Sequence, residues 1–279
     1  MKSTITFVPI GGLANRVLAI TSAIAFCQDY QVKLRILWFK DWGMGADFHS
    51  IMEFSQSFKD IEIIDANWKY YIYDRPRKRN FWIPKLWQKF IFDKRFYDED
   101  MFSSFSVKQL IDVVKKYKSV YLVHCSDFYK KDNILQYLKP TSKVLKLIEE
   151  RRIQLGLDEN MIGIHIRRTD HIQSIQESPL SLFFDVINKE MLNNSTVRFY
   201  VASDDLGEKL RLKNVYGDRI VTLLDKVTRD NEQGILDAIV ELYTLASMKK
   251  IYGSSNSTYS ILAAQLSNID LEILSICNK

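Results

Sequence analysis

Short apolar runs alternate with longer amphipathic stretches along most of this 279-residue chain. Such runs, bounded by glycine or polar turns, are typical of buried strands, and the longer stretches are typical of helices. The alternation predicts an α/β fold with parallel sheets. Strands are predicted at residues 4–10, 34–38, 61–64, 119–124, 161–166, 197–202, 220–223, 250–252 and 271–276. Helices are predicted at residues 15–27, 84–92, 141–155, 178–192, 206–213, 235–248 and 258–266.

The helix predicted at residues 141–155 marks a domain boundary. Thr141 or Ser142 supplies its cap, and Gly156 follows its last residue as a stop signal. We therefore expect a first domain at residues 1–155 and a second at 156–279, each long enough for its own core. In the second domain strands and helices alternate almost without interruption, which predicts a second parallel sheet.

Residues 68–100 interrupt the pattern of the first domain. Nine Lys or Arg residues fall between Lys69 and Arg95, interleaved with tyrosine, phenylalanine and tryptophan. We interpret this stretch as an insertion or lid that contains one short helix. It could bind the acceptor or contact anionic lipid. The alternative is an amphipathic cover over the core.

Composition narrows the class of protein. The chain is 47% hydrophobic and 26% charged, and its net charge of +5 suits an anionic ligand or membrane surface without requiring nucleic acid. Three scattered cysteines favour a reduced, intracellular chain. The N-terminal run is typical of a strand and not of a signal peptide, and no apolar run is long enough to span a membrane. We expect a cytoplasmic protein that could also bind peripherally to the inner face of the membrane.

The most informative motif follows the strand predicted at residues 161–166. A β-branched run ends in Arg167, Arg168, Thr169 and Asp170. Ligands of open α/β sheets bind beyond the carboxyl ends of such strands, and guanidinium forks suit a phosphate or pyrophosphate. The alternative is that the arginines pair with acidic neighbours.

Two further turns follow strands of the second domain. Residues 253–258 are rich in hydroxyl and amide groups and open a helix, which suits phosphate binding, although a simple helix cap is the alternative. The other turn, residues 203–205, follows the strand predicted at residues 197–202. We expect Asp204 to cap the next helix, and the pattern assigns no role to Asp205. Neither the adjacent aspartates nor the four histidines have metal-ligand spacing, so no metal site is predicted.

The first predicted strand leads into Gly11 and Gly12, followed by a helix that contains Asn15 and Arg16. Strand, glycine turn and helix can bring backbone N–H groups to an anion, although a double glycine by itself is a weak signal.

Together these segments resemble the GDP-fucose-dependent fucosyltransferases. The similarity rests on residues 11–16, 165–170, 200–205, 241–243 and 254–260, in the order of the family and densest in the second half. The group includes α1,6-fucosyltransferases, nodulation-factor and protein O-fucosyltransferases, and bacterial α1,2-fucosyltransferases. The resemblance implies a GT-B-like fold: two Rossmann-like domains with parallel sheets that face each other across a cleft. The N-terminal domain would be on the acceptor side, and the C-terminal domain would bind the nucleotide sugar.

The resemblance also implies roles for individual residues. Arg167 would contact the GDP pyrophosphate, and Asp170 would brace the loop or the arginine. Glu241 stands where the family commonly has an aspartate on the guanine or ribose side, so its longer side chain changes that contact. The candidate donor-binding residues are Gly12, Asn15, Arg16, His165, Asp205, Glu241, Ser255, Ser257 and Thr258. The candidate catalytic residues are Arg167, Asp170 and Glu177, with His171 as a further candidate for the base.

The activity implied is an inverting, metal-independent transfer of fucose from GDP-fucose to a glycan hydroxyl. No cofactor is expected, and the partners are the nucleotide sugar and a glycan or glycolipid acceptor, with an anionic membrane surface as a further partner and no nucleic acid. Alternatives are a GT-B transferase that uses another nucleotide sugar and a non-catalytic nucleotide- or glycan-binding protein of the same fold.

Overall fold

The computed structural model describes residues 2–77, 83–130, 134–169, 172–224 and 228–276. The chain forms two compact units. Unit 1 comprises Met1–Thr141 and Arg229–Ile235, and unit 2 comprises Ser142–Thr228 and Leu236–Lys279.

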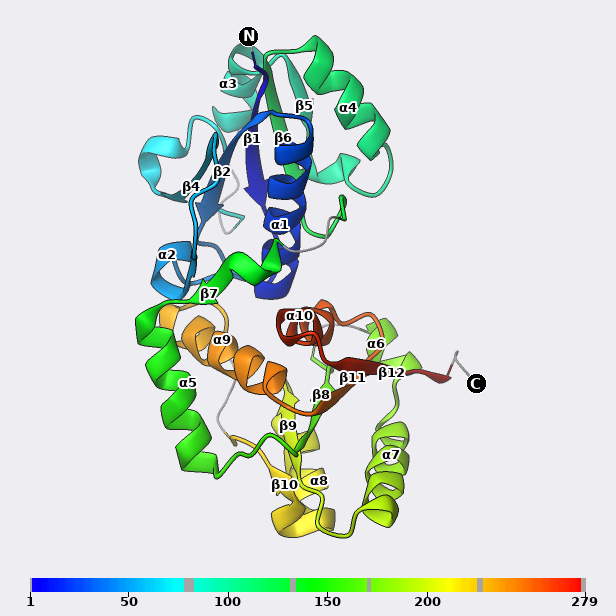
Figure 1. Cartoon of the computed structure of the whole chain (residues 1–279). Coiled ribbons are helices and arrows are strands. Elements are labelled where there is room, and N and C mark those ends of the chain that lie inside the picture. Colours follow the sequence, from blue (N-terminus) through cyan, green and yellow to red (C-terminus); the bar gives the residue numbers. More distant parts are fainter. Residues whose placement is uncertain (1, 78–82, 131–133, 170–171, 225–227, 277–279) are drawn as a thin grey trace. The chain divides into compact units, whose positions relative to one another are not determined.

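Unit 1 contains a parallel sheet whose described strands have the order β4-β2-β1-β6-β5. The strands are β1 (Thr4–Pro9), β2 (Lys33–Phe39), β4 (Ile61–Ala66), β5 (Lys94–Phe96) and β6 (Ser119–His124). In Figure 1, β1 (dark blue) lies between β2 and β6, and Thr4 is paired with Lys33 on one side and Ser119 on the other. The buried residues of β1, β2 and β6 form the core of the unit.

The helices of unit 1 cover this sheet. They are α1 (Leu13–Asp29), α2 (Phe48–Ile51), α3 (Ile83–Ile91) and α4 (Val107–Lys116), with 3₁₀ turns η1 (Trp68–Tyr70), η2 (Asp98–Asp100) and η3 (Leu135–Tyr137). Almost every residue of α1 is buried, because the helix consists mainly of small and apolar residues and packs on β1 and β2. A separate antiparallel pair consists of β3 (Met52–Phe54) and β7 (Leu138–Pro140).

The stretch at residues 68–100 is more regular than the sequence predicts. Besides α3, it contributes β5, an edge strand parallel to β6. Arg77 ties the stretch together, because its guanidinium donates to Asp74 and to both carboxylate oxygens of Asp98 at 2.9–3.0 Å. The buried hydroxyl of Tyr121 on β6 also donates to Asp74, at 2.7 Å. The stretch is therefore anchored on the central part of the sheet.

Unit 2 contains a second parallel sheet, with the order β10-β9-β8-β11-β12 in the described part of the chain. The strands are β8 (Ile162–Ile166), β9 (Phe199–Ser203), β10 (Ile220–Val221), β11 (Lys250–Ser254) and β12 (Asp270–Leu274). The helices are α5 (Ser142–Leu155), α6 (Ile172–Glu177), α7 (Leu180–Asn193), α8 (Leu206–Tyr216), α9 (Glu232–Ala246) and α10 (Thr258–Ser267), with a 3₁₀ turn η4 (Gly217–Arg219). The core is made of residues that include Ile164, Ile166, Phe183, Val201 and Leu212.

The division of the chain differs from the boundary expected after residue 155. The helix α5 belongs to unit 2, where Arg151 Nη2 lies 4.0 Å from Asp237 Oδ1. The helix therefore leads into the second unit, and Gly156 ends α5 inside that unit with a positive φ of 56°. The segment Arg229–Ile235 returns to unit 1, where the Gly45 amide donates to the Arg229 carbonyl at 3.0 Å. In the described ranges, no helix is both long and apolar enough to cross a membrane.

Candidate functional site

The strand order of unit 2 locates a ligand-binding edge. The chain passes from β8 through β9 to β10 on one side, and then crosses to β11 and β12 on the other side. The order of strands therefore reverses between β8 and β11, and open α/β sheets bind ligands beyond the carboxyl ends of the strands at such a point. Arg167 follows β8 and Ser254 ends β11, and the Arg167 amide donates to Ser254 Oγ at 3.0 Å. The arginine motif and the serine-rich turn are thus direct neighbours.

Arg167 is held at this edge by an aspartate that directly follows β9. Its Nη1 lies 2.9 Å from Asp204 Oδ2, and its side chain keeps 22% of its surface exposed. The same carboxylate accepts from the Arg168 amide at 2.8 Å and from the Thr169 hydroxyl at 2.9 Å. Burial opposes the charge on Asp204, but the Arg167 guanidinium and these donors outweigh it, so the pKa of Asp204 is lowered. The turn after β8 is therefore fixed by a carboxylate that stays ionised.

Arg168 has a different environment. Its side chain is buried, Nε donates to Glu208 at 3.1 Å, and the guanidinium lies 5.9 Å from the Phe183 ring centre. Both arginines thus have acidic neighbours, as the alternative interpretation expected. Of the two arginines, Arg167 has the more exposed side chain, at 22% against 8% for Arg168.

The serine-rich turn ends in a helix N-terminus without a side-chain cap. Ser257 is the N-cap of α10, but its side chain makes no capping bond, and the first turn of α10 contains no acidic residue. Asn256 has a φ of 56°, a left-handed conformation that asparagine tolerates. The first backbone N–H groups of a helix lack intrahelical partners and carry partial positive charge. This turn offers the donors that a phosphate group requires.

Glu177 and Ser178 fix the serine-rich turn through hydrogen bonds to Ser255 and Asn256. The Glu177 carboxylate accepts from Ser255 Oγ at 2.5 Å and from Asn256 Nδ2 at 2.9 Å. The fully buried Ser178 accepts from the Ser255 amide at 2.8 Å and donates to the Leu274 carbonyl at the end of β12. The helix predicted to begin at residue 178 begins at Leu180, with Pro179 as its N-cap, so Ser178 lies just outside α7. The serine is one position too early to cap and instead joins three segments.

His165 occupies the last part of β8 and is buried beneath the turn. Its ring stacks on Tyr259 of α10 with a centroid distance of 5.0 Å, and Nδ1 lies 3.4 Å from Ser257 Oγ. The histidine therefore supports the N-terminus of α10. Thr258, the first residue of α10, is partly exposed beside it.

The helix cap expected from Asp204 is provided by the adjacent aspartate. Asp205, not Asp204, caps α8, with Oδ1 accepting from the Glu208 amide at 3.1 Å. Asp204 points to the end of β8 and pairs with Arg167. The expectation that Asp204 caps the helix was wrong, because β9 extends to Ser203 and helix α8 starts only at Leu206.

Glu241 on α9 lies beside a buried lysine. Its Oε1 is 3.4 Å from Lys209 Nζ, and the lysine is almost completely buried. Burial raises the pKa of Glu241, and Lys209 and Arg151 offset only part of this effect. Asp204 also acts to raise the pKa of Glu241, but less than burial does.

In unit 1, the glycine turn after β1 is supported by Arg16. The side chain of Arg16 is fully buried, and it donates to the Gly11 carbonyl at 2.9 Å, to the Phe39 carbonyl at 2.6 Å and to Asp41 at 2.5 Å. Burial lowers the pKa of Arg16 to about 10, although Asp41 acts in the opposite direction. This arginine was predicted to bind the donor. The structure instead assigns its guanidinium to the turn, because no part of the group is exposed.

Gly12 and Asn15 remain on the accessible side of the same turn. Gly12 is the N-cap of α1, has no side chain to cap the helix, and is partly exposed together with Asn15. Of the other candidates, Asp170 and His171 lie outside the described residues. Within the described part of the chain, no group of three or more His, Cys, Asp or Glu side chains could hold a metal ion.

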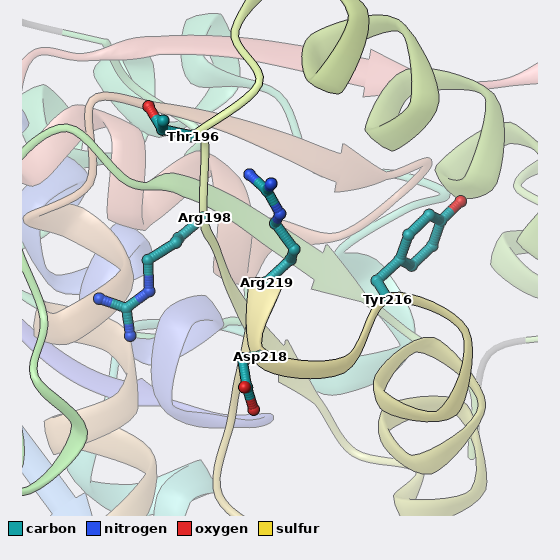
Figure 2. Close-up of a pocket in the computed structure, with 5 residues that line it drawn as sticks. All are labelled: Thr196, Arg198, Tyr216, Asp218 and Arg219. Carbon is teal, nitrogen blue, oxygen red and sulfur yellow. The ribbon is translucent and has the colours of Figure 1, made fainter.

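Unit 2 also contains a cavity of about 610 Å³ that lies apart from these residues. It is lined by Thr196, Arg198, Tyr216, Asp218 and Arg219 (Figure 2). Arg198 and Arg219 directly precede β9 and β10, so the cavity is at the amino edge of the sheet, opposite to the Arg167 edge. Figure 2 shows the two guanidinium groups pointing apart, and each donates to a backbone carbonyl. The two arginines therefore do not form a shared anion site.

Solved fucosyltransferase structures match nearly the whole chain. A structure of NodZ α-1,6-fucosyltransferase soaked with GDP-fucose matches with a TM-score of 0.67 at 14% identity, over 95% of this chain and 93% of that chain. POFUT1 in complex with GDP-fucose matches with a TM-score of 0.61 at 14% identity, over 98% and 99%. A mutant of Arabidopsis thaliana FUT1 in complex with GDP matches with a TM-score of 0.62 at 15% identity, over 98% and 70%.

These matches confirm the predicted fold class and confirm the resemblance to fucosyltransferases at the level of the fold. The chain has the α/β fold of these enzymes, with two parallel sheets in two Rossmann-like units. No protein-family model matches the sequence. A search of curated proteins likewise finds no significant match.

Proposed function

We propose that this chain is a glycosyltransferase that transfers fucose from GDP-fucose to a glycan hydroxyl, with inversion and without a metal ion. The observation that carries the proposal is that Arg167 adjoins the serine-rich turn at the strand reversal of unit 2, where its amide donates to Ser254 Oγ, and that this turn leads into α10, whose N-terminus has no side-chain cap. A guanidinium fork and a row of backbone N–H groups are complementary to a pyrophosphate. The matched enzyme structures contain GDP or GDP-fucose, which supports this choice of nucleotide.

In the proposed reaction, the bond between the fucose C1 and the GDP β-phosphate oxygen breaks as the acceptor oxygen forms a bond with C1 from the opposite face. Attack from the opposite face inverts the configuration, and the sugar passes through an oxocarbenium-like state. Negative charge develops on the departing GDP. Arg167 and the first amides of α10 stabilise this charge, so the role that a metal ion has in other transferases falls to fixed donors.

The proton of the acceptor hydroxyl must be transferred to a base. Glu177 was a candidate, but its carboxylate already accepts from Ser255 and Asn256. We assign Glu177 a positioning role in which it holds the phosphate-binding turn. The other two candidates for the base, Asp170 and His171, lie outside the described residues.

The remaining candidates are assigned by their place around the pyrophosphate. Ser255, Ser257 and Thr258 would form the phosphate turn, with His165 as a support behind it. Asp205 would act through the start of α8. Glu241 would receive the guanine or ribose side of GDP, with its carboxylate held by Lys209.

Unit 1 would serve the acceptor. Its glycine turn presents Gly12 and Asn15, both partly exposed, at the carboxyl edge of its own sheet, where backbone N–H groups at the start of α1 can bind an anionic group. Arg16 would contribute only by fixing this turn. The glycan or glycolipid acceptor would pack against exposed aromatic side chains of the unit outside α3, such as Trp42 and Trp68.

A thermal-shift series tests the choice of donor. The full chain is heated with GDP, GDP-fucose, UDP, ADP or CMP in the presence of EDTA, and a ligand at 100 times its Kd stabilises by about 2.7 kcal/mol. We expect upward shifts with GDP and GDP-fucose only, a loss of both shifts in Arg167→Ala, and retained shifts in the control Arg211→Ala, which changes an exposed arginine of α8. A shift with UDP alone would favour a transferase for another nucleotide sugar. The absence of any nucleotide shift would contradict the proposal and favour a glycan-binding protein.

A further inference from the structure

The helix α3 of unit 1 exposes large apolar side chains. Leu86 is 58% exposed, Trp87 is 49% exposed and Phe90 is 77% exposed. Side chains three and four residues apart share a face of a helix, so Leu86 and Phe90 are neighbours, with Trp87 beside them. Pro84 and Gln88 lie on the opposite face of the helix and are buried. The sequence left open whether this stretch covers the core or binds a partner, and the structure shows that only one side of α3 covers the core.

Positive charge lies directly beside this apolar face. Lys85 and Lys89 are exposed on the same helix, one turn apart. The helix α3 itself contains no acidic residue, and the whole chain has a net charge of +5. Lys85 lies 3.3 Å from Glu99, but both side chains are largely exposed, and exposed pairs of this kind are weak. The lysines can therefore turn toward another anion.

The helix is held firmly on its inner side. The buried Gln88 side chain donates to the Tyr73 carbonyl, and Arg95 of β5 donates to the Phe92 carbonyl at 2.6 Å, just after the helix ends. Because Lys94 begins β5, the end of α3 adjoins the amino edge of the sheet, whereas the Gly12 turn is at the carboxyl edge. The exposed face of α3 is thus a surface separate from the Gly12 turn of unit 1.

We propose that α3 attaches this protein to the surface of a bilayer that contains anionic lipids. A nine-residue helix is about 13–14 Å long, too short to span a bilayer, so it lies in the plane of the interface. Leu86, Trp87 and Phe90 enter the boundary between headgroups and acyl chains. Lys85 and Lys89 contact the lipid phosphates. The combination of an apolar face and an adjacent basic rim fits an anionic membrane in particular, since a neutral surface would use only the apolar part.

Vesicle flotation tests the inference without donor or acceptor, so its result is independent of the proposed enzymatic activity. The full chain is mixed with vesicles of phosphatidylglycerol and phosphatidylcholine in equal parts, or of phosphatidylcholine alone. We expect flotation with the anionic vesicles that weakens as salt is raised, and much weaker flotation with neutral vesicles. Failure to float with anionic vesicles at low salt would overturn the inference.

Two pairs of variants separate the contributions. Lys85→Gln with Lys89→Gln should lower the partition coefficient on anionic vesicles roughly 30-fold, at about 1 kcal/mol for each lysine. The control Lys130→Gln with Lys146→Gln, which removes two highly exposed lysines elsewhere, should have a much smaller effect. Equal losses in both pairs would mean non-specific attraction and would overturn the role of α3.

The apolar face is tested by Leu86→Ser with Phe90→Ser. Because both side chains are exposed, the melting temperature should stay close to that of the unchanged protein, while partitioning falls at least about tenfold. The control is Leu192→Ser, which changes a side chain of α7 that is 88% exposed. Unchanged flotation of the double variant would contradict the inference. If size-exclusion chromatography instead showed a dimer that these substitutions dissociate, the face would be an interface between copies and the membrane role would be wrong.

Discussion

Replacing Asp204 by asparagine tests how the turn after β8 is held. The carboxylate accepts from Arg167, from the Arg168 amide and from the Thr169 hydroxyl, all within 2.9 Å. Asparagine has nearly the same shape and keeps one oxygen for the Arg168 amide, but it has no charge for Arg167. The substitution therefore removes the ion pair while changing the packing very little.

The expected loss of stability follows from the exposure of the two partners. Removing one member of a fully buried ion pair costs about 3–5 kcal/mol. Asp204 is nearly buried, but Arg167 keeps 22% of its side chain exposed, so water solvates part of the freed charge. We therefore expect a loss of about 2–3 kcal/mol, which corresponds to a fall of roughly 4–12 °C in the melting temperature of unit 2.

The neighbouring residue provides a matched control. Asp205 caps α8, and asparagine is an equally good N-cap, so Asp205→Asn should cost less than about 1 kcal/mol, mainly through the lost interaction with the helix dipole. Urea unfolding at neutral pH measures both variants. The reasoning is refuted if Asp205→Asn destabilises as much as Asp204→Asn, or if Asp204→Asn unfolds at the same urea concentration as the unchanged protein.

The same pair predicts a pH dependence. The pKa of Asp204 in the folded chain is lower than its ordinary value of 3.8. Its contribution to stability is therefore fully present above the unfolded-state pKa and is lost as the pH falls through the folded-state pKa. The difference in unfolding free energy between the unchanged protein and Asp204→Asn should be constant near neutral pH and should shrink below about pH 4. A difference that shrinks between pH 6 and 8 would point to another group.

Three further substitutions test other parts of the account. Arg16→Met should destabilise unit 1 by about 3–5 kcal/mol in urea unfolding, because it leaves a buried carboxylate and two carbonyls without their donor; a loss below 1 kcal/mol would contradict this. Gly45→Ala should lower the free energy of unfolding by at least about 1–3 kcal/mol, because the added Cβ would collide with the backbone of Asn231. The control is Gly12→Ala, where the added Cβ has no neighbour within 4 Å and the melting temperature should stay almost unchanged. Glu177→Gln should lower the thermal shift by GDP, because the phosphate turn loses its brace; a normal shift with lost turnover would instead make Glu177 the catalytic base.

The sequence predicts the main sheets well because their strands are buried on both faces. The predicted limits of β6 agree with the structure, and those of β8 differ by one residue. The strands β3, β5 and β7 were not predicted, because a strand of three residues has no periodicity and forms only through pairing with a distant segment. The boundary between the units was placed after α5 instead of before it, since a helix carries no sequence signal for the sheet on which it packs.

For the site, the sequence predicts which strand ends meet but not how each side chain is used. The structure brings Arg167, Asp204 and Ser254 together, as expected for neighbouring carboxyl ends of parallel strands. Which of two adjacent aspartates caps a helix depends on where the strand ends, which sequence alone fixes only to within a few residues. The burial of Arg16 had a signal, because an arginine within an apolar helix must find partners inside the protein. The bridging role of Ser178 had none.

In the proposed reaction, Arg167 stabilises GDP as it leaves, without a metal ion. The most direct test is transfer of labelled fucose from GDP-fucose to an array of glycans, with excess EDTA, by the unchanged protein and by Arg167→Ala. We expect transfer by the unchanged protein in EDTA and a loss of about 100-fold or more in the variant. The melting temperature of the variant without ligand is recorded in parallel to show that it is folded. Transfer by the folded variant within a few-fold of the unchanged protein, or activity that EDTA abolishes, would contradict the proposal.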